Sequence, residues 1–324
     1  MDFSRKFHLQ MENQIRLSSM TRLVAVLILC LSFVSFTGRV RAQPAEVASA
    51  GVPPPNQQPE VIKLQLAIDG SSREVVTHLY KPGGAGPFPL VIYSHGRAGT
   101  PVERSQLKFP VSVGHANYWL RKGVAVVAAV RPGYGETGGS DRENSFTRWS
   151  NGGCLGKANF TGTAVNARQV VVALHGWALE QPWVRKDRLL LEGQSVGGMT
   201  TVAAAALNLP GVVGAVNFAG GSGGYPSESP GKSCNADVLM QTYQEFGPLV
   251  KVPSIWLYAE NDQYWGAEMP RQWHAAFKAG GSDTELVQTG PVEGRDGHTL
   301  INFGGSMWSN PLNAFVKKVG LLMP

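Results

Sequence analysis

Residues 191–198 read LEGQSVGG and connect two stretches of different character. The run RLLL leads into them, as in a strand that is buried on both faces, and the alanine-rich run MTTVAAAAL that follows has the composition of a helix. Ser195 lies between Gly193 and Gly197, whose small size permits a sharp turn, and Gly198 lets a helix pack close to a sheet. The stretch predicts a strand, a tight turn with Ser195 at its tip, and a helix that begins at once.

A serine at such a tip is suited to act as a nucleophile, because the free N–H groups at the helix start stabilise negative charge that develops beside it. The same Gly-x-Ser-x-Gly pattern recurs around Ser222 in FAGGSGGY, residues 218–225. An expected strand precedes Ser222, but two prolines and no helical period follow it. Ser195 is therefore the candidate nucleophile, and Ser222 is expected in a flexible rim loop where it can contact a substrate without attacking it.

Short β-branched runs alternate with longer helical patterns along the rest of the chain. Strands are expected at 61–68, 74–80, 89–93, 124–130, 188–192, 212–218, 254–258 and 284–288. Helices are expected at 112–122, 161–180, 197–208, 236–246, 266–279 and 306–319. This order predicts an α/β fold, with a mostly parallel, doubly wound sheet of about eight strands flanked by helices. The first two strands are close enough in sequence to form a hairpin.

A serine hydroxyl needs a base before it can attack, and in a fold of this kind the order along the chain is serine, acid, histidine. Only His298, in EGRDGHTL, lies beyond the last expected strand, whereas His274 sits in a helical pattern and reads as a packing or surface residue. Asp262 directly follows the strand in SIWLYAEND and is expected to orient the imidazole. Glu260 and Asp296 are the competing acids.

An oxyanion hole requires two N–H donors beside the nucleophile. Val196 follows the serine and supplies one, and the loop after the third strand should supply the other. That strand ends in VIYSHGRAG, so the backbone N–H of Arg97 is the second candidate, and Gly96 allows the chain to turn towards the pocket. The side chain of His95 is expected to be structural.

From about residue 60 to its end the chain resembles the α/β-hydrolase superfamily, and within it the dienelactone hydrolase group and its peptidase relatives. The matching residues are His95-Gly96-Arg97, Arg131-Pro-Gly-Tyr-Gly135, Gly193-Gln-Ser-Val-Gly-Gly198, Asp262 in AEND, and His298 in DGH. The resemblance implies a catalytic triad of Ser195, Asp262 and His298, with the glycines of these motifs in supporting positions.

One departure from the group bears on the substrate. The dienelactone hydrolases that name it use a cysteine nucleophile where this chain has Ser195, which favours ordinary ester hydrolysis over lactone cleavage; the serine also argues against dehalogenation, which uses aspartate. The resemblance thus implies a serine hydrolase that acts on a small acyl substrate. Two alternatives stay open: a serine peptidase of the prolyl oligopeptidase-like type that acts on short peptides, and a non-catalytic binding protein on the same fold.

The N-terminus differs in character from the rest of the chain. Residues 23–36 form an uncharged apolar run of 14 residues, short of the roughly 20 that span a bilayer, and a small-x-small site ends at residue 42. Residues 1–42 are therefore expected to be a signal peptide, 43–60 a Pro-rich linker, and 61–324 a single domain with short rim loops at 131–160 and 219–236. The mature protein is expected in the periplasm or outside the cell.

Charge and composition exclude several classes of partner and cofactor. Residues 1–42 hold six basic and two acidic residues, so only +2 of the net charge of +6 stays with the rest of the chain. Nucleic acid, and a membrane after signal cleavage, are therefore not expected partners. No H-x-x-x-H or clustered cysteine pattern indicates a metal, and no organic cofactor is expected.

The two rim loops carry the remaining candidates. Cys154 and Cys234 are an even pair, and in an oxidising compartment a disulfide across the pocket mouth is favoured over two unrelated buried thiols. Ordinary packing and an aromatic pocket are equally good readings of five other residues, which are Tyr134, Trp149, Tyr225, Tyr264 and Trp265.

Overall fold

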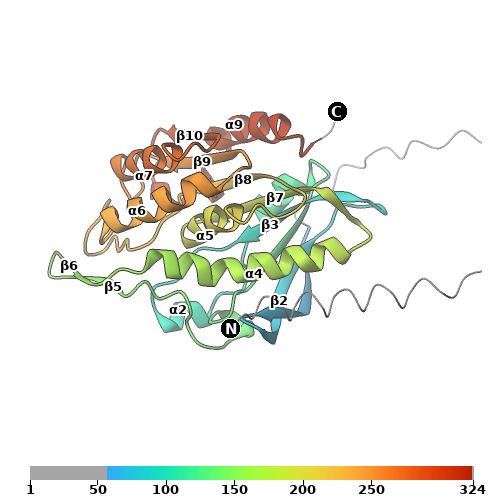
Figure 1. Cartoon of the computed structure of the whole chain (residues 1–324), viewed down its shortest axis with the longest axis horizontal. Helices are drawn as coiled ribbons and strands as arrows, with labels where there is room; N and C mark the ends of the chain where they lie inside the picture. The colour runs from blue at the N-terminus through green and yellow to red at the C-terminus, as the bar shows by residue number, and fades with distance from the viewer. Residues whose placement is uncertain (1–56, 323–324) are drawn as a thin grey trace, which may run out of the picture. The chain divides into compact units, whose positions relative to one another are not determined.

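A mixed sheet of eight strands lies at the centre of residues 57–322, which are the residues that the computed structural model describes (Figure 1). Its spatial order is β1-β2-β4-β3-β7-β8-β9-β10. The strands are β1 (Glu60–Ile68), β2 (Ser71–Tyr80), β3 (Phe88–Ser94), β4 (Ala125–Ala129), β7 (Val184–Gln194), β8 (Val212–Phe218), β9 (Ser254–Ala259) and β10 (Thr284–Thr289). The pairs β1–β2 and β2–β4 are antiparallel, and all other neighbours are parallel. The expected fold class and the expected first hairpin are confirmed.

Side chains from both faces of the sheet are buried, which explains the almost wholly apolar strands. In β4, Ala125, Val127 and Ala129 belong to one hydrophobic core. Val126 and Ala128 alternate with them and belong to the core on the opposite face. A strand placed in this way needs apolar residues at every position.

Helices cover both faces of the sheet. The longer helices are α3 (Val113–Leu120), α4 (Phe160–Glu180), α5 (Val196–Ala205), α6 (Ala236–Phe246), α7 (Glu268–Lys278) and α9 (Gly305–Lys318). Residues of α4, α5, α6 and α7 pack in the first core, and residues of α3 and α9 pack in the second. Figure 1 shows α4 and α5 lying across the sheet on one side. All six expected helices are present, with ends that differ by three residues or fewer.

The short elements were not expected from the sequence. They are α2 (Pro101–Ser105), α8 (Leu300–Phe303), the 3-10 turns η1 (Gly135–Thr137), η2 (Gly247–Leu249) and η3 (Gly297–Thr299), and the hairpin strands β5 (Thr147–Ser150) and β6 (Gly153–Gly156). None of them is longer than five residues, which is too short to show a clear periodic pattern. The hairpin did have a signal, because Asn151-Gly152 forms its two-residue turn with positive φ at both positions, as a type I′ turn requires.

The carboxyl ends of the parallel strands meet at one edge of the sheet, which is where open α/β sheets bind ligands. The segments that leave this edge begin at His95 after β3, Ser195 after β7, Ala219 after β8, Glu260 after β9 and Gly290 after β10. Residues far apart in the sequence are therefore brought together there.

The expected signal peptide and most of the expected linker lie outside the described residues. Between residues 57 and 322, no helix is both long and apolar enough to cross a membrane.

His274 on α7 is a packing residue, as one of the two expected readings had it. Its Nε2 lies 3.1 Å from the Thr284 hydroxyl, its ring meets Trp256 edge-on, and only 7% of the residue is exposed. Burial, and then the charge of Lys278, lower the pKa of His274 to about 4.

The His274→Gln variant should lose part of the acid sensitivity of the fold. An unfolded histidine takes up a proton near pH 6.5, whereas folded His274 resists protonation until about pH 4, so its contribution to stability is present above pH 6.5 and is lost as the pH falls towards 4. This contribution is about 3 kcal/mol at most. Urea unfolding of wild type and variant across this pH range measures it. Equal pH dependence in the two proteins would contradict the assignment.

Candidate active site

Ser195 occupies the turn between β7 and α5. Its φ of 59° and ψ of −127° lie in a region that side chains other than glycine rarely adopt. Main-chain hydrogen bonds hold it there: the Ser195 N–H donates to the Phe218 carbonyl at 3.0 Å, and the Ser195 carbonyl accepts from the Met199 N–H at 3.1 Å. The chain turns sharply at this residue, and the helix begins with the next one.

The glycines around Ser195 allow a close approach of backbones. A Cβ at Gly197 would overlap the carbonyl oxygens of Ser94 and His95 at the end of β3. A Cβ at Gly193 would overlap the Gly197 carbonyl. No side chain fits at either position, so helix α5 starts in direct contact with the strand that lies beside β7.

Two backbone N–H groups are available beside the serine. The Val196 amide is at the first position of α5, where helix geometry offers no acceptor, and within residues 57–322 neither it nor the Arg97 amide is paired. The loop that carries Arg97 passes close to the serine, since a Cβ at Gly96 would lie 3.2 Å from the Cβ of Ser195. Arg97, Val196 and Ser195 all line one cavity.

His95 helps to orient the Arg97 amide. Its ring is buried, with Nδ1 donating to the Gly96 carbonyl at 2.6 Å and Nε2 accepting from the Arg131 N–H at 3.1 Å. Burial and then the charge of Arg131 hold the pKa of His95 well below its usual value, which favours this neutral tautomer. The Arg97 N–H belongs to the same planar peptide as the Gly96 carbonyl, so in the trans form it points away from His95.

A buried aspartate–histidine pair lies next to the turn. Asp262 is 1% exposed, and its Oδ2 accepts from His298 Nδ1 at 3.0 Å. Its Oδ1 accepts from the backbone N–H groups of Tyr264 and Trp265 at 2.7 and 3.1 Å. Gln194, which precedes the serine, donates through Nε2 to the His298 carbonyl at 3.1 Å and ties the histidine segment to the end of β7.

The two competing acids occupy other environments. Asp296 uses Oδ1 to accept the backbone N–H groups of Gln263 and His298, each at 2.8 Å, and so fixes the loop rather than the imidazole. Glu260 is about half exposed and lies 3.7 Å from Arg271. The geometry at the imidazole therefore selects Asp262.

The cavity in front of Ser195 has a volume of about 840 Å³. Four of the five expected aromatic residues line it: Trp149, Tyr225, Tyr264 and Trp265. The ring of Tyr264 stacks on that of His298 at 4.0 Å, and Trp265 meets the same imidazole edge-on at 5.5 Å. The two rings thus separate the aspartate–histidine pair from solvent.

The expectation that Tyr134, the fifth of these residues, lines an aromatic pocket is wrong. It is fully buried and does not line the cavity. Its hydroxyl donates to Glu143 at 2.9 Å, and its ring meets His95 edge-on at 4.7 Å. A buried carboxylate that needs donors draws this tyrosine into the core, and no pattern in the sequence indicates Glu143 as that partner.

A buried ion pair supports the loop after β3. Arg131 donates to both carboxylate oxygens of Glu143, at 2.5 and 2.9 Å, and its Nη1 also donates to the Ser94 hydroxyl at 3.0 Å and the His95 carbonyl at 2.6 Å. Burial lowers the pKa of Arg131, but the charge and hydrogen bonds of Glu143 outweigh it, and the net shift is upward. The guanidinium therefore stays charged while it holds the loop.

Asp141 adds a second ionic contact to the same loop. Its two oxygens accept from Arg97 Nη1 and Nη2, each at 2.6 Å, and Arg104 lies 3.5 Å away. Neither Asp141 nor Glu143 was identified from the sequence. They lie in a rim loop with no periodic pattern, so only the folded structure reveals their partners.

Ser222 lies near Ser195 in a different setting. It is buried and lines the cavity, and the N–H of its neighbour Gly221 donates to the Ser195 carbonyl at 3.1 Å. Its backbone is not in the strained positive-φ region, and the next helix begins only at Ala236. The features of a nucleophile turn are therefore absent around Ser222.

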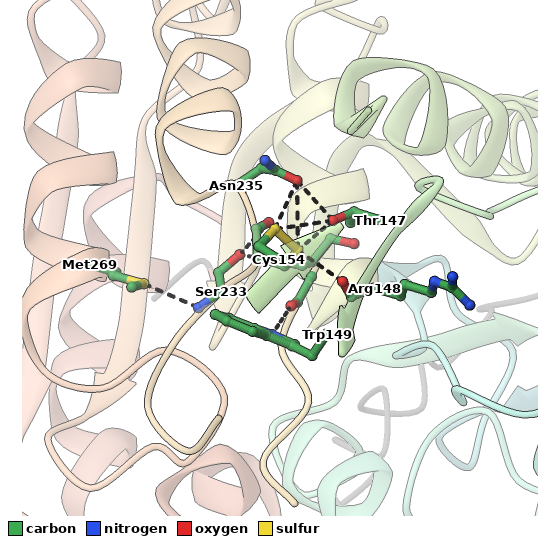
Figure 2. Close-up of a disulfide and its surroundings, with 10 residues drawn as sticks. Thr147, Arg148, Trp149, Cys154, Ser233, Asn235 and Met269 are labelled. Carbon is green, nitrogen blue, oxygen red and sulfur yellow. Dashed lines mark hydrogen bonds between the residues drawn. A yellow bond between two sulfur atoms is a disulfide. The ribbon is translucent and has the colours of Figure 1, made fainter. Parts of the chain in front are cut away.

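The two rim loops are joined by a Cys154–Cys234 disulfide (Figure 2). Cys154 lies on β6, and Cys234 lies just before α6.

In the described part of the chain, no three His, Cys, Asp or Glu side chains are arranged to hold a metal ion.

Comparison with solved structures identifies the fold. Similar structures include 2,6-dihydroxy-pseudo-oxynicotine hydrolase, with a TM-score of 0.53 at 17% identity over 82% of this chain and 68% of that one. Est1E from Butyrivibrio proteoclasticus, solved with ferulic acid, has a TM-score of 0.53 at 16% identity over 79% and 98%. A Klebsiella pneumoniae protein provisionally named a dienelactone hydrolase has a TM-score of 0.50 at 14% identity over 82% and 99%. This chain therefore has the α/β-hydrolase fold. No protein-family profile and no curated protein matches the sequence.

The Gly197→Ala variant should be destabilised by about 2 to 3 kcal/mol, because the new methyl group overlaps two carbonyl oxygens of β3. Gly176→Ala is the matched control: Gly176 also lies in a helix, but a Cβ there meets nothing within 4 Å. The control should be stabilised by about 0.5 to 1 kcal/mol through helix propensity. Denaturant unfolding measures both, and equal effects would contradict the close contact.

Replacing Arg131 with Met should cost about 3 to 5 kcal/mol, because Glu143 is left buried without its charge partner. The double variant Arg131→Met/Glu143→Leu should recover most of this loss in urea unfolding. Its crystal structure should still show residues 95–97 displaced, because their carbonyls have lost a donor. A double variant as unstable as the single one, or an unmoved loop, would contradict the role given to this pair.

Proposed function

We propose that this chain is a serine hydrolase that cleaves a carboxylic ester through an acyl-enzyme on Ser195. The observation that carries the proposal is the strained conformation of Ser195 at the start of α5, together with the buried pair of His298 and Asp262, which Gln194 ties to the same turn. The esterases and hydrolases among structures of the same fold support this reaction class.

In the proposed reaction, the Ser195 hydroxyl oxygen attacks the ester carbonyl carbon while His298 takes its proton. Nδ1 of His298 is engaged with Asp262, which leaves Nε2 as the nitrogen that accepts the proton. The negative charge of Asp262 stabilises the imidazolium that forms. His298 then returns the proton to the departing alcohol.

The negative charge that develops on the carbonyl oxygen is proposed to rest on the N–H groups of Val196 and Arg97. Donors placed in advance in this way are worth about 10² to 10³ in rate each. Water, activated by His298, then attacks the acyl-enzyme and restores the serine. The proposed reaction uses a small acyl substrate and no metal or organic cofactor.

Export to the periplasm or the exterior is part of the proposal. The disulfide between Cys154 and Cys234 supports it, because such bonds persist in oxidising compartments. The expected signal peptide is the other support.

Fluorophosphonate labelling tests the nucleophile. A fluorophosphonate reacts with an activated serine, so wild type and Ser222→Ala should be labelled and Ser195→Ala should not. Because Ser222 lines the same cavity, its variant is a matched control for changes in access. Labelling that persists in Ser195→Ala would refute the proposed nucleophile, and an unlabelled wild type would favour a binding protein on this fold.

A substrate panel separates the enzyme classes. Esters of p-nitrophenol should be cleaved with a kcat/KM well above that for aminoacyl p-nitroanilides, since the proposal assigns ester hydrolysis. The reverse preference would identify a peptidase.

A further inference from the structure

One wall of the cavity consists of two segments that the disulfide joins. Residues 147–149 of the hairpin line the cavity, and so do residues 222–225 of the loop after β8. We refer to these seven residues as the bridged wall. Ser195 and Val196 line the same cavity at the start of α5.

The hairpin has little packing of its own to hold it in place. All of the residues in β5 and β6 are exposed or half-buried. A two-stranded hairpin without a buried face is only marginally stable. Figure 1 shows it projecting beyond the start of α4. Its position must therefore depend on particular attachments to the body.

Those attachments all reach the loop after β8 (Figure 2). The disulfide joins Cys154 to Cys234, and Trp149, which pairs with Cys154 across the hairpin, donates from Nε1 to the Gly223 carbonyl at 3.0 Å. The Thr147 hydroxyl donates to Asn235 at 2.8 Å. The covalent bond thus brings the Trp149 ring and Gly223 together.

The loop side of the wall is held by the same residues. The Cys234 N–H donates to the Gly223 carbonyl at 2.8 Å, and the Ser233 hydroxyl donates to the Ser222 carbonyl at 2.6 Å. Gly223 therefore receives one hydrogen bond from the hairpin and one from Cys234. Releasing the disulfide would loosen both halves of the wall.

The wall contributes two aromatic side chains to the cavity, those of Trp149 and Tyr225. The only polar group of the Trp149 side chain is committed to Gly223, so its ring surface is what remains for a ligand. Tyr225 is 48% exposed and lines the same cavity. A volume of about 840 Å³ is in the range that holds drug-sized ligands and is far more than a short acyl ester needs.

We propose that Trp149 is a specificity-determining residue that binds a planar ring of the substrate remote from the ester carbonyl, and that the Cys154–Cys234 disulfide holds it in position. This inference rests on the proposed ester hydrolysis at Ser195. Ring-on-ring contacts favour a substrate whose acyl or alcohol part carries an aromatic ring.

The test compares three esters by pH-stat titration: ethyl acetate, benzyl acetate and methyl 3-phenylpropanoate. The second carries a ring on the alcohol side and the third on the acyl side. The readout is the ratio of kcat/KM for the better ring-bearing ester to that for ethyl acetate, which cancels general losses of activity.

Trp149→Ala should lower this ratio about tenfold, mostly through KM, because one buried ring contact is removed. Trp149→Phe is the matched control that keeps a ring but loses the hydrogen bond to Gly223, and it should retain most of the ratio. The double variant Cys154→Ser/Cys234→Ser should lower the ratio in the same direction with Trp149 intact. An unchanged ratio in Trp149→Ala, or in the double cysteine variant, would overturn the proposal.

A binding measurement separates failure of this inference from failure of the proposed function. Calorimetric titration with 3-phenylpropanoate and with benzyl alcohol uses Ser195→Ala protein, with and without Trp149→Ala. At least one of these probes should bind, with a Kd about tenfold weaker when Trp149 is absent. If wild type cleaves no ester but this difference is found, the hydrolase proposal alone fails. If wild type cleaves esters but the Kd does not depend on Trp149, the wall proposal alone fails.

Discussion

The close contact between the start of α5 and the end of β3 determines where the candidate nucleophile and the two amides beside it lie. A backbone turn with φ of 59° at Ser195 costs about 1 to 3 kcal/mol and persists only where its surroundings enforce it. Here those surroundings are a helix in which all ten residues are buried and the adjacent backbone at Gly197, where no side chain fits. The same contact brings the amides of Val196 and Arg97 to one serine.

The buried ion pair of Arg131 and Glu143 sets the direction of the loop that follows β3. A buried ion pair adds little net stability, because desolvation offsets the attraction. The guanidinium of Arg131 nevertheless donates to Glu143, to the Ser94 hydroxyl at the end of β3, and to the carbonyls of the next two residues in the loop. Because His95 and Arg131 hold the Gly96 carbonyl on one side, the Arg97 N–H of the same planar peptide points to the other side. The pair is therefore better explained by orientation of the loop than by stability.

The local sequence pattern was sufficient to predict the scaffold and part of the candidate site. Apolar strands, helical periods and the Ser195 turn predicted the eight-stranded sheet and the six main helices, because burial on two faces leaves a strong periodic signal. The order of motifs led to Asp262 and His298, which the structure brings to 3.0 Å. Asp141, Glu143 and the true position of Tyr134 could not be predicted, because each depends on partners in loops that carry no period.

The disulfide lies at a segment that the hydrophobic cores do not hold in place. A crosslink across 80 residues restricts the unfolded chain by about 4 to 5 kcal/mol wherever it is placed, so entropy alone does not explain its location. The two hydrophobic cores around the sheet include no residue of the β5–β6 hairpin. The hairpin of β5 and β6 is the segment without a buried face, and it carries Trp149 into the cavity. Besides restricting the unfolded chain, a covalent bond at this point also restrains the part of the cavity wall that carries Trp149.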